Sequence, residues 1–231
     1  MALKRTTLVG ATVEELLSLI ESRHLQAGDT LPSTSDLADE LEVSRTVIRE
    51  AIAELAGQGL LVRRQGKDTE IAFPGSKEFE RLLRIRSALL DTQTEEIVEF
   101  FREQAIAAAR LAASASGQLD DSSLSGALTG IIDAATTEAR VHGEERFLHE
   151  LSVLSRNALF TLTVDGCSAV LGKVRLASWE RISQSEELIR SAHQVFQEIR
   201  SSVVGGQSDL AMLATHELFA LIYGETVGPG Q

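Results

Sequence analysis

Two short helical patterns followed by a hairpin pattern, all within residues 25–73, constrain the fold of this chain more than any other feature. Ser33 is placed to cap the first helix, whose apolar side is expected to be Leu37, Ala38 and Leu41. After the turn Glu42-Val43-Ser44, a second helix is expected to run to about Gly57. Its apolar residues follow the i, i+3, i+4, i+7 spacing of a helix with one buried face: Ile48, Ala51, Ile52 and Leu55.

Residues 60–64 and 69–73 flank Gln65-Gly66-Lys67-Asp68 with alternating apolar and polar side chains, which is the pattern of a short hairpin. Two helices joined by a tight turn and followed by such a hairpin form a winged helix-turn-helix. In helix-turn-helix proteins the second helix enters the major groove of DNA. The sequence therefore predicts double-stranded DNA as a partner.

The first turn of the second helix carries the candidate DNA-reading side chains, because a recognition helix presents its N-terminal residues to base edges. Arg45, Thr46 and Arg49 lie opposite the apolar face of this helix, whereas Ser44 is interpreted mainly as its cap. Arginine can bond guanine through two hydrogen bonds, and threonine can contact a phosphate or a thymine methyl group. Near the hairpin, the residues expected to approach the DNA backbone are Gly66, Lys67, Arg63 and Arg64.

The overall charge is acidic, although a DNA-binding surface needs positive charge somewhere. The formal net charge is −12 at pH 7. Residues 1–75 hold 8 Lys and Arg against 12 Asp and Glu, which gives −4. Acidic residues therefore outnumber basic ones both in this part and in the rest of the chain. The arginines of the second helix and the basic residues of the hairpin would have to supply the positive patch. Acidic surroundings would then suppress non-specific binding and make recognition strongly salt-dependent.

The run VSRTVIREAIAELAGQGLLVRRQG, which begins at Val43, resembles the DNA-binding domain of GntR-family bacterial transcription regulators. The later part of the chain is similar to the FadR subfamily, whose helical effector domain is called FCD. This likeness rests on RLAASA at 110–115, on residues 144–159 and on two late histidines. The chain departs from the family at Ser35, where an arginine is usual, and at Asp68, where a glycine is usual.

The expected fold is mainly α, with a winged helix-turn-helix at 1–75 and an all-α domain for effector binding and dimerisation at 76–231. Pro74-Gly75-Ser76 is the expected boundary. A first helix is expected to open on a capping box of Thr12 and Glu15. Helices are expected near 78–90, 94–116, 122–142, 144–155, 158–177, 179–204 and 207–224. Breaks are expected at Gly117, Gly143 and Gly205-Gly206, with Gly166 either a break or inside a helix.

The family resemblance implies a divalent-metal site in the second domain. The family pattern has an acidic residue and a histidine four apart on one helix, followed by two histidines on the last long helices. His193 and His216 match the two late positions, and without a gap Glu144 takes the acidic position. Leu148 then stands where the first histidine is expected. The sequence therefore matches three of the four ligands.

Three alternatives for this site are left open by the sequence. Glu144, His193 and His216 could hold Zn, Ni or Mn and leave open positions for a carboxylate effector. A shift of one residue would instead use Glu145 and His149, although helical phase places Leu148 inward and His149 on a more polar face. The third interpretation is a metal-free pocket in which Glu144, His193 and His216 line the site of a less polar effector.

These patterns favour a DNA-binding transcription regulator that binds an inverted-repeat operator as a homodimer. The family resemblance implies that it acts as a repressor and responds to an organic acid or related metabolite. The alternatives are a metal-dependent helical-bundle enzyme and an architectural DNA-binding protein without a sensor role. An enzyme is not expected, because no nucleophile elbow, phosphate loop or HExxH motif is present. A lone cysteine, Cys167, and the lack of an apolar run of about 20 residues favour a cytoplasmic protein without a membrane partner.

Overall fold

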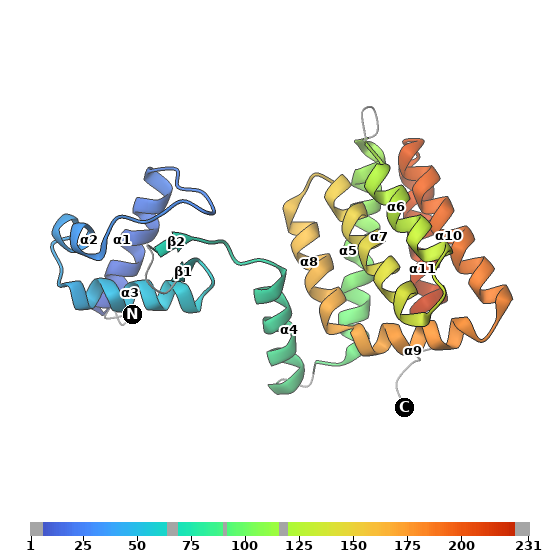
Figure 1. Ribbon diagram of the computed structural model, residues 1–231, viewed down its shortest axis with the longest axis horizontal. Coiled ribbons are helices and arrows are strands. Elements are labelled where there is room, and N and C mark those ends of the chain that lie inside the picture. Colours follow the sequence, from blue (N-terminus) through green and yellow to red (C-terminus); the bar gives the residue numbers. More distant parts are fainter. Residues whose placement is uncertain (1–6, 64–68, 90–91, 116–119, 225–231) are drawn as a thin grey trace, which may run out of the picture. The chain divides into compact units, whose positions relative to one another are not determined.

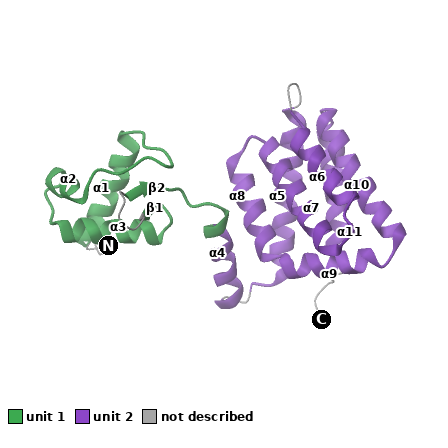
Figure 2. Cartoon of the chain, viewed as in Figure 1, with its two compact units in different colours: residues 1–78 green, residues 79–231 purple. Residues whose placement is uncertain are grey.

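The computed structural model describes residues 7–63, 69–89, 92–115 and 120–224. The chain divides into two units, residues 1–78 and 79–231 (Figure 2). Over the described residues it contains eleven helices and one two-stranded antiparallel sheet. The predicted fold class, a winged helix-turn-helix with a small hairpin followed by an all-helical domain, is confirmed.

Unit 1 contains three helices and the hairpin strands. Their bounds are α1 Leu8–Ser22, α2 Thr34–Glu40, α3 Arg45–Gly57, β1 Leu61–Arg63 and β2 Thr69–Ile71. The two strands pair antiparallel, with Leu61 opposite Ile71 and Val62 opposite Glu70. Both α1 and α2 pack on α3, and the apolar side chains between them form a buried core. Its fully buried members include Leu16, Leu37, Ile48 and Leu55.

The first helix begins earlier than the sequence suggested, and the capping box of Thr12 and Glu15 was wrong. Thr7 is the cap of α1, because its hydroxyl accepts a hydrogen bond from the Gly10 amide at 3.1 Å. Thr12 lies buried inside the helix, where its hydroxyl donates to the Leu8 carbonyl at 2.8 Å. Starting at Thr7 adds a turn to the helix and brings Val9 against the core of unit 1.

Most of unit 2 is a bundle of helices that follow one another along the chain (Figure 1). Their bounds are α4 Ser76–Leu89, α5 Thr94–Ser114, α6 Ser122–Ile132, α7 Thr137–Leu154, α8 Ala158–Val170, α9 Gly172–Ser183, α10 Glu186–Val204 and α11 Ser208–Tyr223. Helix α5 packs against α7, α8, α10 and α11, and α6 packs against α7. None of the described helices is long and apolar enough to cross a membrane.

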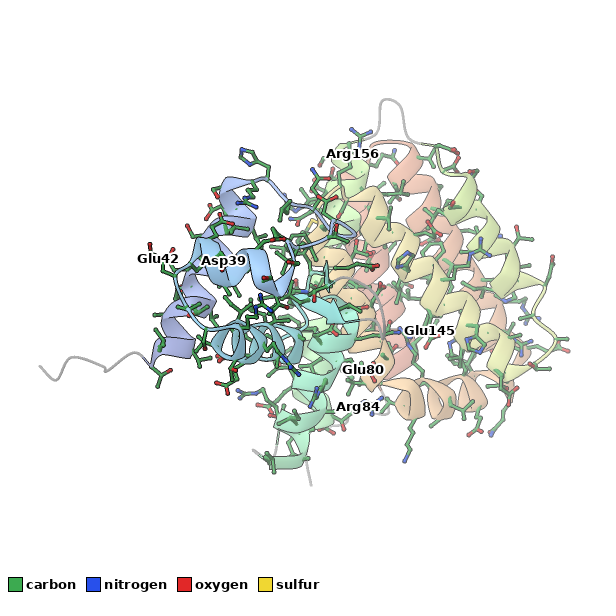
Figure 3. All side chains as sticks on the ribbon, turned by 60° about the vertical axis from the view of Figure 1, so that its left-hand side comes forward. Asp39, Glu42, Glu80, Arg84, Glu145 and Arg156 are labelled. Carbon is green, nitrogen blue, oxygen red and sulfur yellow. The ribbon has the colours of Figure 1, made fainter. Side chains whose placement is uncertain are left out.

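Helix α4 is joined to the bundle by a few side chains. Glu80 and Arg84, one turn apart on α4, form an ion pair with 2.7 Å between Oε1 and Nε (Figure 3). Arg84 also donates from Nη2 to the Ala169 carbonyl at the end of α8, at 3.0 Å. The Phe79 and Phe100 rings lie 6.3 Å apart. These contacts hold α4 against the rest of unit 2, although no α4 residue is buried.

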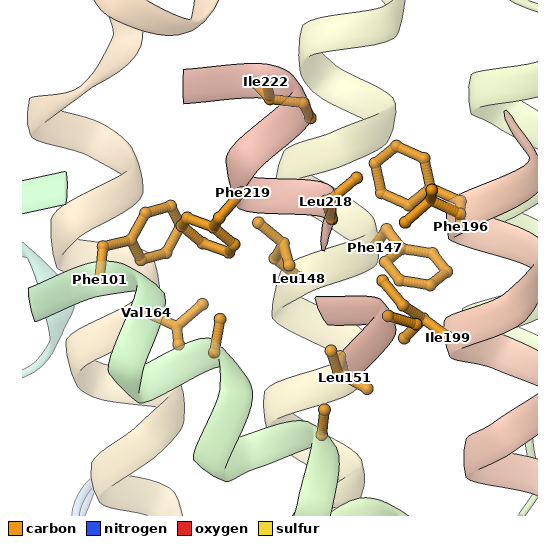
Figure 4. Close-up of a cluster of buried hydrophobic side chains, with 14 of the residues drawn as sticks. Phe101, Phe147, Leu148, Leu151, Val164, Phe196, Ile199, Leu218, Phe219 and Ile222 are labelled. Carbon is orange, nitrogen blue, oxygen red and sulfur yellow. The ribbon is translucent and has the colours of Figure 1, made fainter. Parts of the chain in front are cut away.

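The core of unit 2 is built around edge-on pairs of aromatic rings (Figure 4). The Phe101 and Phe219 centroids lie 5.0 Å apart, and those of Phe147 and Phe196 lie 4.9 Å apart. Such tilted geometries place the positive edge of one ring against the negative face of the other. Leu148 lies among these rings with 1% of its surface exposed, so its predicted inward orientation is confirmed.

The expected helix 122–142 is two helices. Helix α6 ends at Ile132, and α7 begins at Thr137 after a cap by Thr136, whose hydroxyl accepts from the Ala139 amide at 3.2 Å. A β-branched hydroxyl residue offers this alternative to a continuing helix, because its side chain replaces the missing backbone partner. The expected helix 144–155 is the second half of the same α7.

The expected helices 158–177 and 179–204 are three helices. The chain turns at Leu171, between α8 and α9, and again at Gln184-Ser185 before α10. Ser185 caps α10 by accepting from the Leu188 amide at 3.3 Å. Gly166 lies inside α8, Gly205 ends α10, and Gly117 lies outside the described residues.

Gly143 lies inside α7, so the break expected there was wrong. A Cβ atom on Gly143 would lie 2.6 Å from Ile131 Cγ1 and 3.2 Å from the Ile131 Cα atom. Both distances are shorter than ordinary van der Waals contacts. The glycine is therefore required by the close approach of α6 and α7, and not by a turn.

Candidate functional sites

The first turn of α3 separates an exposed polar face from a buried apolar one. Ser44 is the cap of α3, because its hydroxyl accepts from the Val47 amide at 3.3 Å. Arg45, Thr46 and Arg49 are exposed. The opposite face is fully buried in the unit 1 core, as predicted: Ile48, Ala51, Ile52 and Leu55. The structure thus groups the three candidate DNA-reading side chains on one solvent-facing turn.

Ser35 has a role that the sequence did not reveal. Its hydroxyl accepts a hydrogen bond from Arg45 Nη2 at 2.7 Å, which links the first turn of α2 to the first turn of α3. The sequence suggested only that the family's usual arginine is lost at this position. The contact could have been anticipated from the fold, because the helix-turn-helix geometry brings these two turns together. Ser35 therefore positions one of the two candidate reading arginines.

The turn between α2 and α3 is held by backbone contacts and one unusual backbone conformation. The Val43 amide donates to the Ala38 carbonyl at 3.1 Å, and Glu42 adopts a left-handed conformation with φ of 51°. Ser33 caps α2 as predicted, since its hydroxyl accepts from the Asp36 amide at 3.2 Å. The turn thus fixes where the first residues of α3 lie relative to α2.

The predicted contacts of the hairpin tip lie outside the described residues. This applies to Arg64, Gly66 and Lys67, and to the side chain of Arg63. The Arg63 backbone is the last residue of β1, opposite Thr69. Their DNA contacts stay predictions.

Replacing Ser44 with alanine is expected to lower the free energy of unfolding by about 1 kcal/mol, because the Val47 amide loses its capping partner. Ser44→Asp is expected to keep the melting temperature near that of the parent, since a carboxylate also caps a helix and interacts favourably with its N-terminus. Thermal melts of the two variants measure the difference. Equal destabilisation by both substitutions would contradict the capping role.

Glu144, the predicted acidic ligand, is fully buried in α7 and already has partners. Its carboxylate accepts hydrogen bonds from Trp179 Nε1 at 2.6 Å and from the Tyr223 hydroxyl at 2.8 Å. One of its oxygens also lies 3.2 Å from Arg175 Nε. Both oxygens are therefore engaged by side chains of α9 and α11.

His193, on α10, is partly buried near Arg140, on α7. Its Nε2 atom is buried and has no hydrogen-bond partner, and the same is true of Arg140 Nε. Arg140 Nη1 donates to the Ser183 hydroxyl at 3.3 Å. Burial, together with the positive charge of Arg140, lowers the pKa of His193 below its usual value. The environment therefore disfavours the imidazolium form.

This lowered pKa predicts a loss of stability at acid pH. Above about pH 6.5, His193 is neutral in the folded and the unfolded chain. As the pH falls below that value, the unfolded chain takes up the proton first, so the folded state loses stability until its own lower pKa is reached. His193→Gln is expected to show a smaller drop in melting temperature between pH 7.5 and 5.5 than the parent. An unchanged drop would show that other groups cause it.

His216, on α11, is exposed and lines a cavity of about 330 Å³ between α5 and α11. Its basic lining groups are His216 and Arg102, and Glu95 and Glu99 stand beside them. The apolar lining is Val98, Phe219, Ala220 and Tyr223, completed by Gly224. Arg102 Nε lies 3.1 Å from Glu103 Oε1. This cavity has the size of a small-molecule site and combines an apolar floor with a few charged groups.

A second cavity, of about 360 Å³, lies over α7 and α8 and contains the alternative pair of ligands. Its lining includes Glu145 and His149, together with His142, Arg146, Asp165, Ser168 and Ala169. His149 Nδ1 lies 2.9 Å from Asp165 Oδ1, whereas Glu145 lies 3.3 Å from His142 Nδ1. Glu145 and His149 thus share a cavity, but each is paired with a different residue.

The predicted metal set does not fit this structure. Over the described residues, no group of three or more His, Cys, Asp or Glu side chains is placed to hold a metal ion. Glu144 is bonded to residues of the interior, His193 lies beside Arg140, and His216 lines an exposed cavity. The structure does not bring the three together, because the coordination sites of Glu144 are taken by Arg175, Trp179 and Tyr223.

The cysteine offers no ready nucleophile. Cys167 is buried in α8, and burial raises the pKa of its thiol to about 12. A thiol with such a pKa stays protonated at neutral pH.

Comparison with known proteins finds relatives for unit 1. Residues 8–71 match the family model of bacterial regulatory proteins, gntR family. Over 60 residues the chain is 42% identical to the uncharacterized HTH-type transcriptional regulator YcbG of Bacillus subtilis, covering 26% of each protein. Over 85 residues it is 39% identical to the probable fructoselysine utilization operon transcriptional repressor of Escherichia coli, covering 36% of this chain and 34% of that protein. The sequence matches thus span about a third or less of these relatives.

The fold of both units is shared with a solved structure. Streptococcus agalactiae GntR superposes with a TM-score of 0.75, covering 94% of this chain and 99% of that one at 22% sequence identity. At that identity the likeness establishes the fold and leaves ligands and partners open.

Proposed function

We propose that this chain is a transcription regulator and that it reads an operator with the first turn of α3. The premise is that residues 8–71, which match the gntR family model, are a DNA-binding domain. The observation that carries this proposal is the exposed group of Arg45, Thr46 and Arg49 at the N-terminus of α3. A recognition helix uses these positions for base contacts, and arginine suits guanine. The relatives named above as regulators support the same role, which is not an enzymatic one.

The DNA partner we propose is an inverted repeat bound by a homodimer. Helix-turn-helix domains bind two half-sites about one helical turn of DNA apart, and the two-fold symmetry of the protein matches that of the operator. Repression is the activity we propose, as in the E. coli relative named as a repressor.

The effector site we propose is the cavity lined by His216. An organic acid would place its carboxylate near Arg102 and His216 and its carbon chain against Val98 and Phe219. A ligand changes DNA affinity only by its different affinity for the two states of the protein. Binding at this cavity would therefore have to favour one arrangement of the two DNA-binding domains of the dimer over another.

The proposed function is tested by selecting bound duplexes from a random pool, and by thermal shift against a panel of organic acids. We expect the selection to enrich an inverted repeat. We also expect that one of the acids changes the affinity of the protein for this repeat. The change should be lost in His216→Ala and kept in His142→Ala, a histidine of the other cavity. No enriched sequence would contradict the regulator. An enriched sequence whose affinity no ligand changes would indicate an architectural protein without a sensor role.

A further inference from the structure

The interior of unit 2 contains a buried charged cluster that no part of the DNA-binding role uses. Arg175 on α9 and Glu144 on α7 are both completely buried, with 3.2 Å between Arg175 Nε and a Glu144 oxygen. Tyr223 on α11 joins them, because its hydroxyl accepts from Arg175 Nε at 3.0 Å and donates to Glu144 at 2.8 Å. Trp179 donates to the other Glu144 oxygen at 2.6 Å. The cluster thus connects three helices.

Further groups complete the surroundings of the guanidinium. Arg175 Nη2 donates to the Ser168 hydroxyl at 2.7 Å, and Nη1 lies 3.1 Å from Glu145 Oε1 without the alignment of a hydrogen bond. The Phe101 ring faces the guanidinium carbon at 5.4 Å, within the range of a cation–π contact. Burial lowers the pKa of Arg175, but the charge of Glu144, together with the contributions of Tyr223 and Glu145, outweighs burial and raises that pKa above its ordinary value. The guanidinium therefore stays positively charged.

We propose that the guanidinium of Arg175 is a built-in cation that takes the role a metal ion would have at Glu144, so that unit 2 is complete without a metal. A buried carboxylate needs a cation and hydrogen-bond donors around it, and a metal ion is one way to supply them. Here a guanidinium, a phenol and an indole supply both. No oxygen of Glu144 is left without a partner.

This arrangement explains why the other predicted ligands are elsewhere. The side chains that bond to Glu144 are Arg175, Trp179 and Tyr223, and neither late histidine is among them. His193 lies near Arg140, and His216 lines the exposed cavity, of which Tyr223 is also a lining residue. Leu148, one turn after Glu144, is part of the dry core and needs no polar partner. The inference concerns the folding of unit 2, so it stands or falls independently of whether the chain binds an operator.

The first test measures metal dependence in the full chain. The purified protein is dialysed against EDTA, and its melting temperature is compared with that of samples given Zn²⁺, Ni²⁺ or Mn²⁺. Metal that binds the folded state raises its stability, so a metal-dependent unit would show a clear shift. We expect shifts below about 1 °C and no stoichiometric metal by elemental analysis. A fall in melting temperature on chelation, restored by one of these ions, would overturn the proposal.

The second test removes each partner of the cluster. Arg175→Met leaves the Glu144 charge buried without its cation, and a drop in melting temperature of about 10 °C is expected for a chain of this size. The control is Arg190→Met, because Arg190 is 71% exposed and its partner Glu186 lies 3.6 Å away in solvent. That control is expected to shift the melting temperature by about 1 °C or less.

The double variant Arg175→Met/Glu144→Gln separates the charge from the packing. It removes both charges and leaves an amide that Trp179 and Tyr223 can still contact, so it is expected to recover at least half of the loss. If Arg175→Met does not fold, the melting temperature of this double variant still tests the proposal, because a folded double variant shows that the unpaired charge caused the loss. An Arg175→Met shift no larger than that of Arg190→Met, or a double variant less stable than Arg175→Met, would contradict the built-in cation.

Discussion

Arg49→Ala will weaken binding to the selected operator by about 10- to 100-fold without lowering the melting temperature. The physical reason is that a two-bond contact between arginine and guanine contributes about 1–3 kcal/mol, which corresponds to a change of this size in Kd. Arg49 is exposed on the first turn of α3 and contributes nothing to the buried face of that helix. Fluorescence anisotropy with the selected duplex measures the loss.

Arg190→Ala is the matched control, because it removes the same charge from an exposed position of unit 2. It is expected to change operator affinity by less than about twofold. Arg45→Ala should resemble Arg49→Ala, and Ser35→Ala should cause a smaller loss, since it frees the Arg45 guanidinium from its 2.7 Å hydrogen bond. Full affinity of both arginine variants would rule out docking through the first turn of α3.

Gly143→Val will lower the melting temperature of unit 2 by about 3–10 °C. A side chain at this position meets Ile131 on α6, whose Cγ1 would lie 2.6 Å from the new Cβ atom. Forcing extra atoms into a packed core costs about 1–3 kcal/mol, and a chain of this size loses about 2–4 °C for each kcal/mol. Differential scanning calorimetry measures the shift.

Gly130→Ala is the control for Gly143→Val. Gly130 is a glycine of α6 with nothing within 4 Å of its would-be Cβ atom. Alanine has the higher helix propensity, so this variant is expected to melt at the same temperature or slightly higher. If Gly143→Val were as stable as Gly130→Ala, the close approach of α6 and α7 would not require a glycine.

Local patterns were sufficient where the fold depends on neighbours in the sequence. The caps Ser33 and Ser44 and the buried face of α3 could be predicted, because each depends on residues within a few positions. The same reasoning misplaced the start of α1. Thr7 and Thr12 are both hydroxyl residues able to cap, and only the packing of the additional turn distinguishes them.

Glycines show a second limit of local reasoning. Gly143 and Gly205 look alike as helix breakers in the sequence, yet one lies inside α7 and the other ends α10. What distinguishes Gly143 is the approach of Ile131 from another helix, a contact between helices that periodicity does not reveal.

The candidate site in unit 2 shows the same limit more strongly. Glu144 could be singled out by its likeness to a metal ligand, but its partners Arg175, Trp179 and Tyr223 come from two other helices. Arginine in a helical pattern usually indicates a solvated charge, since buried arginines are rare. Nothing in the sequence marks Arg175 as the exception, because its burial is decided by how α7, α9 and α11 pack.

The most direct test of the central claim is the affinity of the full chain for a selected inverted-repeat duplex and for a scrambled duplex of the same composition, measured across a series of salt concentrations. Sequence-specific regulators prefer their operator by a factor of at least about 10³, and their affinity falls steeply as salt displaces the phosphate contacts. We expect both behaviours from the wild-type protein. Equal affinity for the two duplexes at every salt concentration would show that the first turn of α3 does not read a DNA sequence.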